Sequence, residues 1–295
     1  MENNKPTWPG ELKSLFERVK SIPANDELEL RVAVHDLQTF ATQPSDNYEQ
    51  LDVAILESCC NLVRRASQYL PLSQSPHHLK DFHNKPYIRS INALIRALLQ
   101  KLEYPQHGVC LDGLQLQRCK LDHIDLSHSS MRLTDLSHCG LSHASLSHTD
   151  LRFANLMSSS MAHSNLSQSL LEFCEMDWCD LSHADLHRCQ LIRADLGGSI
   201  LDHADLSSAI LSSANLANAT LTAANLSQAN FFGSRLHSTK LHGADLSGTG
   251  ITPERLENVE MAFQADRGTI WGSIKDCGGR NPLDPFYYSE QQSLL

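Results

Sequence analysis

The feature that most constrains this chain is a period of five residues between Val109 and Ile251. Every fifth residue from Leu111 to Ile251 is Leu, Met, Phe or Ile, through twenty-nine consecutive positions. Two residues before each of them stands a second series, which after Ile124 contains only Ala, Ser, Thr or Cys. A period of five fits neither a helix nor a strand, so the pattern indicates a repeat architecture.

The repeated words resemble the A(D/N)LXX signature of the pentapeptide-repeat family. Examples are Ala154-Asn155-Leu156, Ala184-Asp185-Leu186, Ala194-Asp195-Leu196 and Ala244-Asp245-Leu246. The resemblance covers about half of the chain and implies a right-handed, quadrilateral parallel β-helix over residues 109–251, with four pentapeptides in each coil and about seven coils. In such a narrow coil the large residue fills the interior, and the small residue lets neighbouring backbones close around it.

The cysteines fit the same pattern. Of the nine cysteines, five occupy the small position of the repeat: Cys119, Cys139, Cys174, Cys179 and Cys189. We expect them to be reduced core residues. Cys119 and Cys139 are twenty residues apart and would be neighbours in adjacent coils, which leaves a redox or metal role open, although no CxxC pair supports it.

Four helical patterns precede the repeat and predict a small helical domain over residues 1–108. Asp26-x-x-Glu29 and Asp46-x-x-Glu49 resemble capping boxes that open the second and third helices. The apolar positions of the first, third and fourth patterns are Leu12, Leu15, Phe16 and Val19; Leu51, Ile55, Cys59, Leu62, Ala66 and Tyr69; and Ile88, Ile91, Ile95, Leu98 and Leu102. We expect the domain to cover one open end of the β-helix.

Residues 252–295 are expected to cover the other end. Thr252-Pro253 suits the start of a capping helix to about Ala265, because Thr is a good N-cap and Pro a good first helical residue. The rest is expected to be an irregular tail, through which a homodimer is possible. Its last residues, Glu290 to Leu295, also match an acidic dileucine sorting signal, a loose motif.

Composition narrows the class of protein. The net charge of −10 argues against a direct nucleic-acid binder. No run of eighteen apolar residues predicts a membrane span, and the first residues lack the basic and apolar regions of a signal peptide. We therefore expect a cytoplasmic protein, or one exported without a classical signal. The family resemblance favours a bacterial source and allows a secreted effector.

Histidines form one outward column, spaced twenty residues apart: His123, His143, His163, His183 and His203. Stacked at about the 4.8 Å strand spacing, the rings would pack flat and could bond the flanking Asp or Asn side chains. A pH-sensing role and a metal site, at His163 and His183, remain alternatives, although a regular ladder offers no closed tetrahedral cage. For His77, His78 and His83 we expect a solvated loop.

A second outward column is apolar. Leu133, Phe153 and Phe173 occupy equivalent positions, and Trp178 lies near them in sequence. Exposed aromatic residues in a row are seldom left in contact with water. Either the N-terminal helices fold back onto these residues, or the residues form a surface that binds a protein partner.

A third series is acidic and includes Asp125, Asp185 and Asp205 on one side and Asp135 and Asp195 on the opposite side. These side chains could satisfy backbone groups at the corners. The family resemblance adds a second interpretation, because quinolone-resistance members present an acidic rod that mimics DNA and binds DNA gyrase. Residues 109–251 carry fourteen Asp or Glu against eight Lys or Arg, a mild excess for such a mimic.

No motif of a catalytic site is present, and the many Ser-His pairs are products of the repeat rather than a triad. We therefore predict a protein without enzymatic activity, cofactor or metal. The sequence favours a scaffold that presents a rigid β-helical surface to a protein partner. A DNA-mimicking gyrase protector and a secreted effector are the alternatives.

Overall fold

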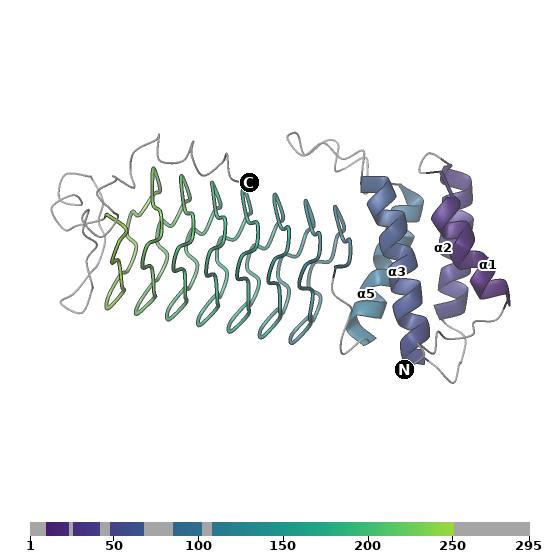
Figure 1. Cartoon of the computed structure of the whole chain (residues 1–295), viewed down its shortest axis with the longest axis horizontal. Coiled ribbons are helices and arrows are strands. Elements are labelled where there is room, and N and C mark those ends of the chain that lie inside the picture. Colours follow the sequence, from purple (N-terminus) through teal and green to yellow (C-terminus); the bar gives the residue numbers. More distant parts are fainter. Residues whose placement is uncertain (1–9, 24–25, 42–47, 68–84, 102–107, 251–295) are drawn as a thin grey trace, which may run out of the picture.

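A computed structural model describes residues 10–23, 26–41, 48–67, 85–101 and 108–250. Figure 1 shows two parts in line, a group of helices and a stack of coils that continues away from them. Each part follows one of the two periods in the sequence. The helices carry apolar residues three and four apart, and the coils carry them five apart.

The helices are α1 (Gly10–Ser21), α2 (Glu27–Ala41), α3 (Tyr48–Ser67) and α5 (Pro86–Lys101). The backbone N–H of Glu29 donates to Asp26 Oδ1 over 3.1 Å, so the predicted cap of the second helix is confirmed. The predicted apolar faces are buried together, as Val19, Ile55 and Ile95 illustrate with no exposed surface. These helix residues belong to one continuous hydrophobic cluster with the inward residues of the coil.

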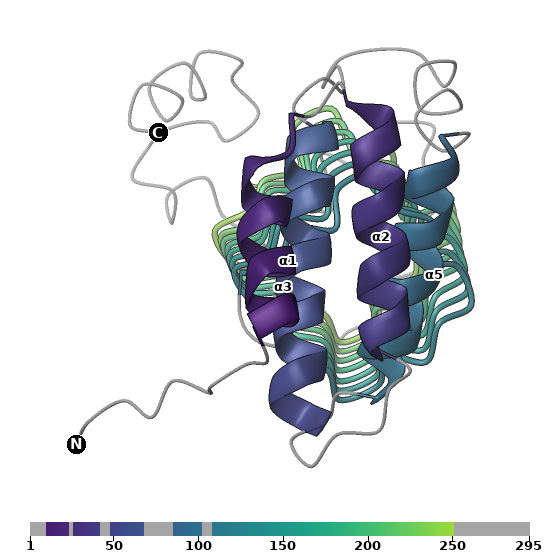
Figure 2. The same cartoon turned by 90° about the vertical axis from the view of Figure 1, so that its right-hand side faces the viewer.

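The coils are joined by parallel bridges between residues twenty apart, from Cys110 and Ser130 to Asn225 and Asp245. Four series of bridges alternate along the chain, beginning at Cys110, Gln115, Lys120 and Asp125, so each coil has four sides. Viewed near the coil axis, successive coils lie behind one another (Figure 2). This is the predicted four-sided β-helix, with an N-terminal helical region.

The large residue of each pentapeptide points into the coil. Leu116, Leu186 and Leu226 have no exposed surface. Polar residues at the small position bond the coil backbone, as when Thr134 Oγ1 donates to the carbonyl of Leu111 over 2.7 Å. The eight cysteines among the described residues are buried free thiols, as predicted for the five in the repeat.

The helices lie at the end of the coil stack where the repeat begins, rather than along its sides (Figure 1). Arg96 of α5 donates from Nη2 to the backbone carbonyl of Gln117 in the first coil over 3.1 Å. Of the two alternatives for the column of Leu133, Phe153 and Phe173, a cover of folded-back helices is therefore wrong for the described helices, whose place agrees with the expectation that they cover one open end of the coil. A polar contact at the coil end holds α5 instead.

Several predictions lie outside the described residues. They are the capping helix from Pro253, the tail with its dileucine motif and any homodimer contact there, the loop with His77, His78 and His83, and the pattern ends at Asp46, Tyr69 and Leu102. The domain limits at 108 and 251 stay predictions. Among the described residues no helix has the length and apolar character required to cross a membrane.

Candidate functional site

Each side of the coil ends in a two-residue turn. The backbone N–H of Leu114, for example, donates across such a turn to the carbonyl of Leu111 over 3.2 Å. The second turn residue has a positive φ throughout, 63° at His123 and 61° at Trp178, as a type II turn requires. This conformation favours glycine, so each of the non-glycine residues there adopts it against the preference of the backbone.

The carboxylates of the acidic series accept hydrogen bonds from backbone N–H groups at these turns. The N–H of Ser127 donates to Asp125 Oδ1 over 3.0 Å, and the N–H of Gly197 donates to Asp195 Oδ1 over the same distance. Asp135, Asp185 and Asp205 accept from the equivalent N–H two residues later. The predicted structural role of these carboxylates is therefore confirmed, and each has an oxygen already engaged by the chain.

The histidine corner consists of His123, His143, His163, His183 and His203. Their rings stack with centroids 4.8–4.9 Å apart and planes within 1–5° of parallel. All five side chains are exposed. The predicted flat stacking is confirmed, and it follows from coil spacing.

The geometry of this corner does not suit a metal ion shared by adjacent rings. Parallel rings displaced by 4.8 Å, as at His163 and His183, place equivalent nitrogen atoms about as far apart. Two zinc–nitrogen bonds of about 2.1 Å span at most about 4.2 Å. No group of three or more potential metal-ligating side chains occurs in the described part of the chain.

The apolar column lies at the diagonally opposite corner. Phe153 and Phe173 stack with centroids 4.8 Å apart, and the guanidinium of Arg193 in the next coil lies 5.6 Å from the centre of the Phe173 ring. Leu133 and Phe153 are half-buried, whereas Phe173 is 40% exposed. The prediction of an exposed row therefore needs correction, because stacking covers all of it except its far end.

Trp178 occupies the next corner along the chain and, at 68%, is more exposed than the other large hydrophobic side chains identified on the coil surface, Phe173 and Ile200. A Cβ atom added to Gly198, in the following coil, would lie 2.9 Å from both Cε3 and Cζ3 of Trp178. The indole ring therefore rests directly on the backbone of Gly198. No side chain at Gly198 competes for that space, and much of the ring is open to solvent.

Between these two corners runs one side of the coil, which we name the aromatic side. It carries Glu175 and Asp195, which face each other across a bridge, with Asp177 at its edge beside Trp178. Partial burial, followed by repulsion from Asp177, Asp135 and Asp195, raises the pKa of the Glu175 carboxyl. Negative charge is thus concentrated beside the exposed ring.

The corner that holds the phenylalanines is fixed by ion pairs. Arg152 donates to both oxygens of Asp150, over 2.8 Å from Nε and 2.7 Å from Nη2. One coil earlier, Arg132 pairs with the buried carboxylate of Asp112, which also accepts from the backbone N–H of Arg132. These arginines are already paired with carboxylates, so they do not neutralise the aromatic side.

Sequence reasoning found Phe173 and Trp178 but missed Glu175, Asp177 and Gly198 as their neighbours. A signal was present, because Gly198 stands twenty residues after Trp178, in the next coil. A glycine following a tryptophan in one column leaves room for the ring. Glu175 was assigned only as a member of the regular acidic series, and Asp177 was not assigned a role.

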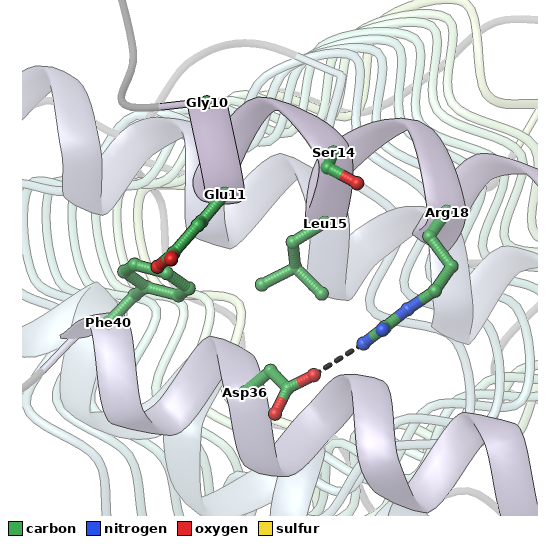
Figure 3. A pocket seen from close by; sticks show the side chains of 7 residues that line it. All are labelled: Gly10, Glu11, Ser14, Leu15, Arg18, Asp36 and Phe40. Atoms are coloured by element: carbon green, nitrogen blue, oxygen red, sulfur yellow. Dashed lines mark hydrogen bonds and ion pairs between the residues drawn. The ribbon is translucent and has the colours of Figure 1, made fainter.

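The helical region contains a cavity of about 500 Å³ between α1 and α2 (Figure 3). Its lining is Gly10, Glu11, Ser14, Leu15, Arg18, Asp36 and Phe40. Arg18 and Asp36 form an ion pair across it. The lining thus combines two carboxylates, one guanidinium and one hydroxyl with apolar Leu15 and Phe40.

Cys119 and Cys139 are neighbours inside the coil, as predicted. A hydrogen bond from Cys139 and the nearby charge of Arg96 lower the pKa of the Cys119 thiol, whereas contact with Cys119 and burial raise that of Cys139. Cys119 is 1% exposed and Cys139 2%. A reagent in solution therefore reaches neither sulfur in the folded chain.

Comparison with known proteins agrees with the five-residue repeat found in the sequence. A family model described as pentapeptide repeats matches residues 134–172, 174–212 and 209–248, in eight copies. A search of curated proteins found no match.

Similar solved structures are also pentapeptide-repeat proteins or resistance proteins. A pentapeptide-repeat protein from Nostoc, alr5209, is 30% identical, with 36% of this chain and 84% of that one covered, at a TM-score of 0.31. A pentapeptide-repeat protein from the thylakoid lumen of Arabidopsis thaliana is 24% identical, with 35% of this chain and 76% of that one covered, at a TM-score of 0.26. A trypsin-treated variant of QnrB1, a plasmid-mediated fluoroquinolone resistance protein, is 16% identical, with 55% of this chain and 91% of that one covered, at a TM-score of 0.38.

Proposed function

We propose that this chain, which belongs to the pentapeptide-repeat family, is a non-enzymatic scaffold whose right-handed β-helix presents its aromatic side to a protein partner. The binding residues in this proposal are Phe153, Phe173 and Trp178, with Leu133 supporting the phenylalanine stack. Proteins of this family are generally structural or binding scaffolds.

The observation that carries the proposal is the backbone conformation and exposure of Trp178. Its backbone holds a φ of 61°, which glycine adopts more readily, and its side chain is 68% exposed. Neither backbone preference nor burial explains a tryptophan there. Exposed tryptophan beside other aromatic residues is typical of the residues that dominate protein interfaces.

Rigidity supports the same function. Each coil is bonded to the next at every side, as between the N–H of Met176 and the carbonyl of Asp195 over 2.7 Å. A surface fixed in this way loses little conformational entropy when a partner binds.

The acidic series gives less support to the alternative of a DNA mimic that binds gyrase. Asp125, Asp185 and Asp205 each have an oxygen bonded to the turn backbone, and the excess of acidic residues is modest. A gyrase supercoiling assay with a fluoroquinolone tests this alternative directly. Protection lost in Asp185→Asn but kept in Trp178→Ala would favour the mimic over the aromatic side.

Site-specific photo-crosslinking tests the proposed function. Benzoylphenylalanine is placed at Phe173 and, as a matched control, at Gln168, which has the same positive φ but lies at the corner before it. In extract of the source organism, we expect a discrete protein adduct from position 173, lost in the Trp178→Ala background, and none from position 168. Equal adducts at both positions, or none at 173, would contradict the proposal.

A further inference from the structure

We infer that the aromatic side binds a cationic, apolar segment of a partner protein, with an Arg or Lys side chain on the ring of Trp178 and an apolar side chain against Phe173. This inference rests on the proposed function and specifies the chemistry of the partner. It commits to a basic segment rather than to an acidic or neutral one.

The ring of Trp178 is a platform for a cation. The Gly198 backbone supports the indole from the following coil, and the side chain remains 68% exposed. An ammonium or guanidinium within about 6 Å of such a ring is attracted by its electron-rich face, and tryptophan is the best of the aromatic side chains for this contact. The chain already uses the same chemistry nearby, where Arg193 lies over Phe173.

The carboxylates beside the platform make it selective for positive charge. Glu175 is exposed, and Asp177 and Asp195 both lie near enough to disfavour its ionised form. An arriving cation relieves this repulsion, whereas an anionic group such as a phosphate adds to it. The local charge therefore favours a basic protein segment over a nucleic acid.

Nearby cations do not already fill this role. Arg193 is placed over Phe173, and Arg152 is held by Asp150 through two hydrogen bonds. Asp195 has Oδ1 bonded to Gly197 and to the Nδ2 of Asn215, so the acidic group is held in place. Within the described part of the chain, the carboxylates at the aromatic side are thus positioned beside the ring without a guanidinium lying on Trp178.

The apolar half of the segment is accommodated by the phenylalanine column. Phe173 is 40% exposed at the end of a stack whose earlier members are half-buried. One side of the coil separates it from Trp178, with Glu175 between them. A segment lying across this side would meet an apolar ring, a carboxylate and a tryptophan in turn, which fits a segment that carries an apolar residue together with basic residues.

The test uses the full chain and three labelled hexapeptides of equal length, in which leucine alternates with arginine, glutamine or glutamate. Binding is measured by fluorescence anisotropy. We expect the arginine peptide to bind at least about tenfold more tightly than the glutamine peptide, and the glutamate peptide not to bind measurably. Equal binding of the arginine and glutamate peptides would overturn the inference.

Variants then locate the site. Trp178→Ala is expected to weaken binding of the arginine peptide about tenfold. The double variant Glu175→Gln with Asp177→Asn is expected to weaken binding severalfold and to make the affinity less dependent on salt. Gln168→Ala, at another corner, should leave affinity unchanged. Thermal unfolding of each variant checks that the coil is intact, and loss of binding in all three folded variants alike would also overturn the inference.

The two proposals fail separately. If position 173 crosslinks a protein but the arginine peptide neither binds nor competes with that adduct, the aromatic side binds a partner of another chemistry, and only the inference fails. If the arginine peptide binds at Trp178 but no protein crosslinks at position 173, the charge selectivity stands and the proposed function fails.

Discussion

The histidine corner and the aromatic side are built on the same backbone but differ in regularity. Both place rings on second turn residues with positive φ and stack them 4.8–4.9 Å apart. At the histidine corner five successive coils repeat one contact. At the aromatic side one column changes from Leu133 to stacked phenylalanines to Arg193. In the neighbouring column, Trp178 rests on Gly198.

This difference teaches how to interpret outward columns in such a fold. The coil spacing stacks any planar side chain that recurs every twenty residues, so a stack alone indicates structure. Trp178 has no such explanation, because the next coil supports its ring with the Gly198 backbone rather than with a stacked side chain and leaves it 68% exposed. Irregularity on a regular scaffold is therefore the stronger indication of a binding surface.

The largest expected effect comes from the interior that both surfaces share. Leu186→Ala removes a fully buried side chain and should lower the free energy of unfolding by about 2–5 kcal/mol. Gln168→Ala, an exposed control, should change it by no more than about 0.5 kcal/mol. Denaturant unfolding measures both, and similar small changes would show that the interior leucines do not hold the coil together.

The second prediction compares carboxylates at equivalent turn positions. Asp112 is 2% exposed and accepts from Ser130 Oγ over 2.6 Å and from Arg132, so Asp112→Asn should destabilise the chain by about 3 kcal/mol. Asp122, at the histidine corner, is exposed and accepts the N–H of Ser142, so Asp122→Asn should lower stability by about 1 kcal/mol or less. Equal losses in chemical unfolding would argue against a special anchor at the phenylalanine corner.

The third prediction isolates the contact of Trp178. Gly198→Ala and Gly243→Ala place a side chain at nearly the same φ, 66° and 67°. Only the first meets the indole ring, because the nearest atoms at Gly243, which stands in the histidine column, are 4.0 Å away. Gly198→Ala should therefore be the more destabilising by about 1 kcal/mol in paired thermal unfolding, and identical losses would mean that the ring is not seated on Gly198.

The smallest expected effect has the opposite sign. Because burial and neighbouring carboxylates raise the pKa of Glu175 in the folded chain, the native state binds a proton more readily than the unfolded state. Ionised Glu175 therefore opposes folding above its folded pKa, and this penalty disappears as the pH falls through that value. Glu175→Gln should stabilise the chain slightly at pH 7, within about 0.5 kcal/mol, and have no effect near pH 3.

The matched control is Asp205→Asn, in the same repeat position on the side next to the histidine corner. Its carboxylate accepts the N–H of Ser207 over 2.9 Å, so the substitution should not stabilise the chain at pH 7. Thermal unfolding at the two pH values distinguishes the cases. A loss of stability in Glu175→Gln at pH 7 would mean that the acidic group is not in repulsion.

The period of five made the fold predictable, since the identity of every inward residue follows from it. The turn role of Asp125 and Asp195 also followed, because short acidic side chains commonly bond nearby backbone. The contact of the Trp178 ring with Gly198 could not be predicted from the sequence, since it depends on the direction in which the Trp178 side chain points relative to the neighbouring coil. The place of the helices at an open end of the coil was expected, but the contact of Arg96 with Gln117 was not, since no local pattern encodes it.

The central claim is that binding belongs to the aromatic side and not to the more regular histidine corner. The most direct test measures the dissociation constant of the leucine–arginine peptide for Trp178→Ala and His163→Ala, two substitutions of exposed rings at positive φ. We predict about a tenfold weakening for Trp178→Ala and none for His163→Ala. An equal or greater loss in His163→Ala would contradict the account.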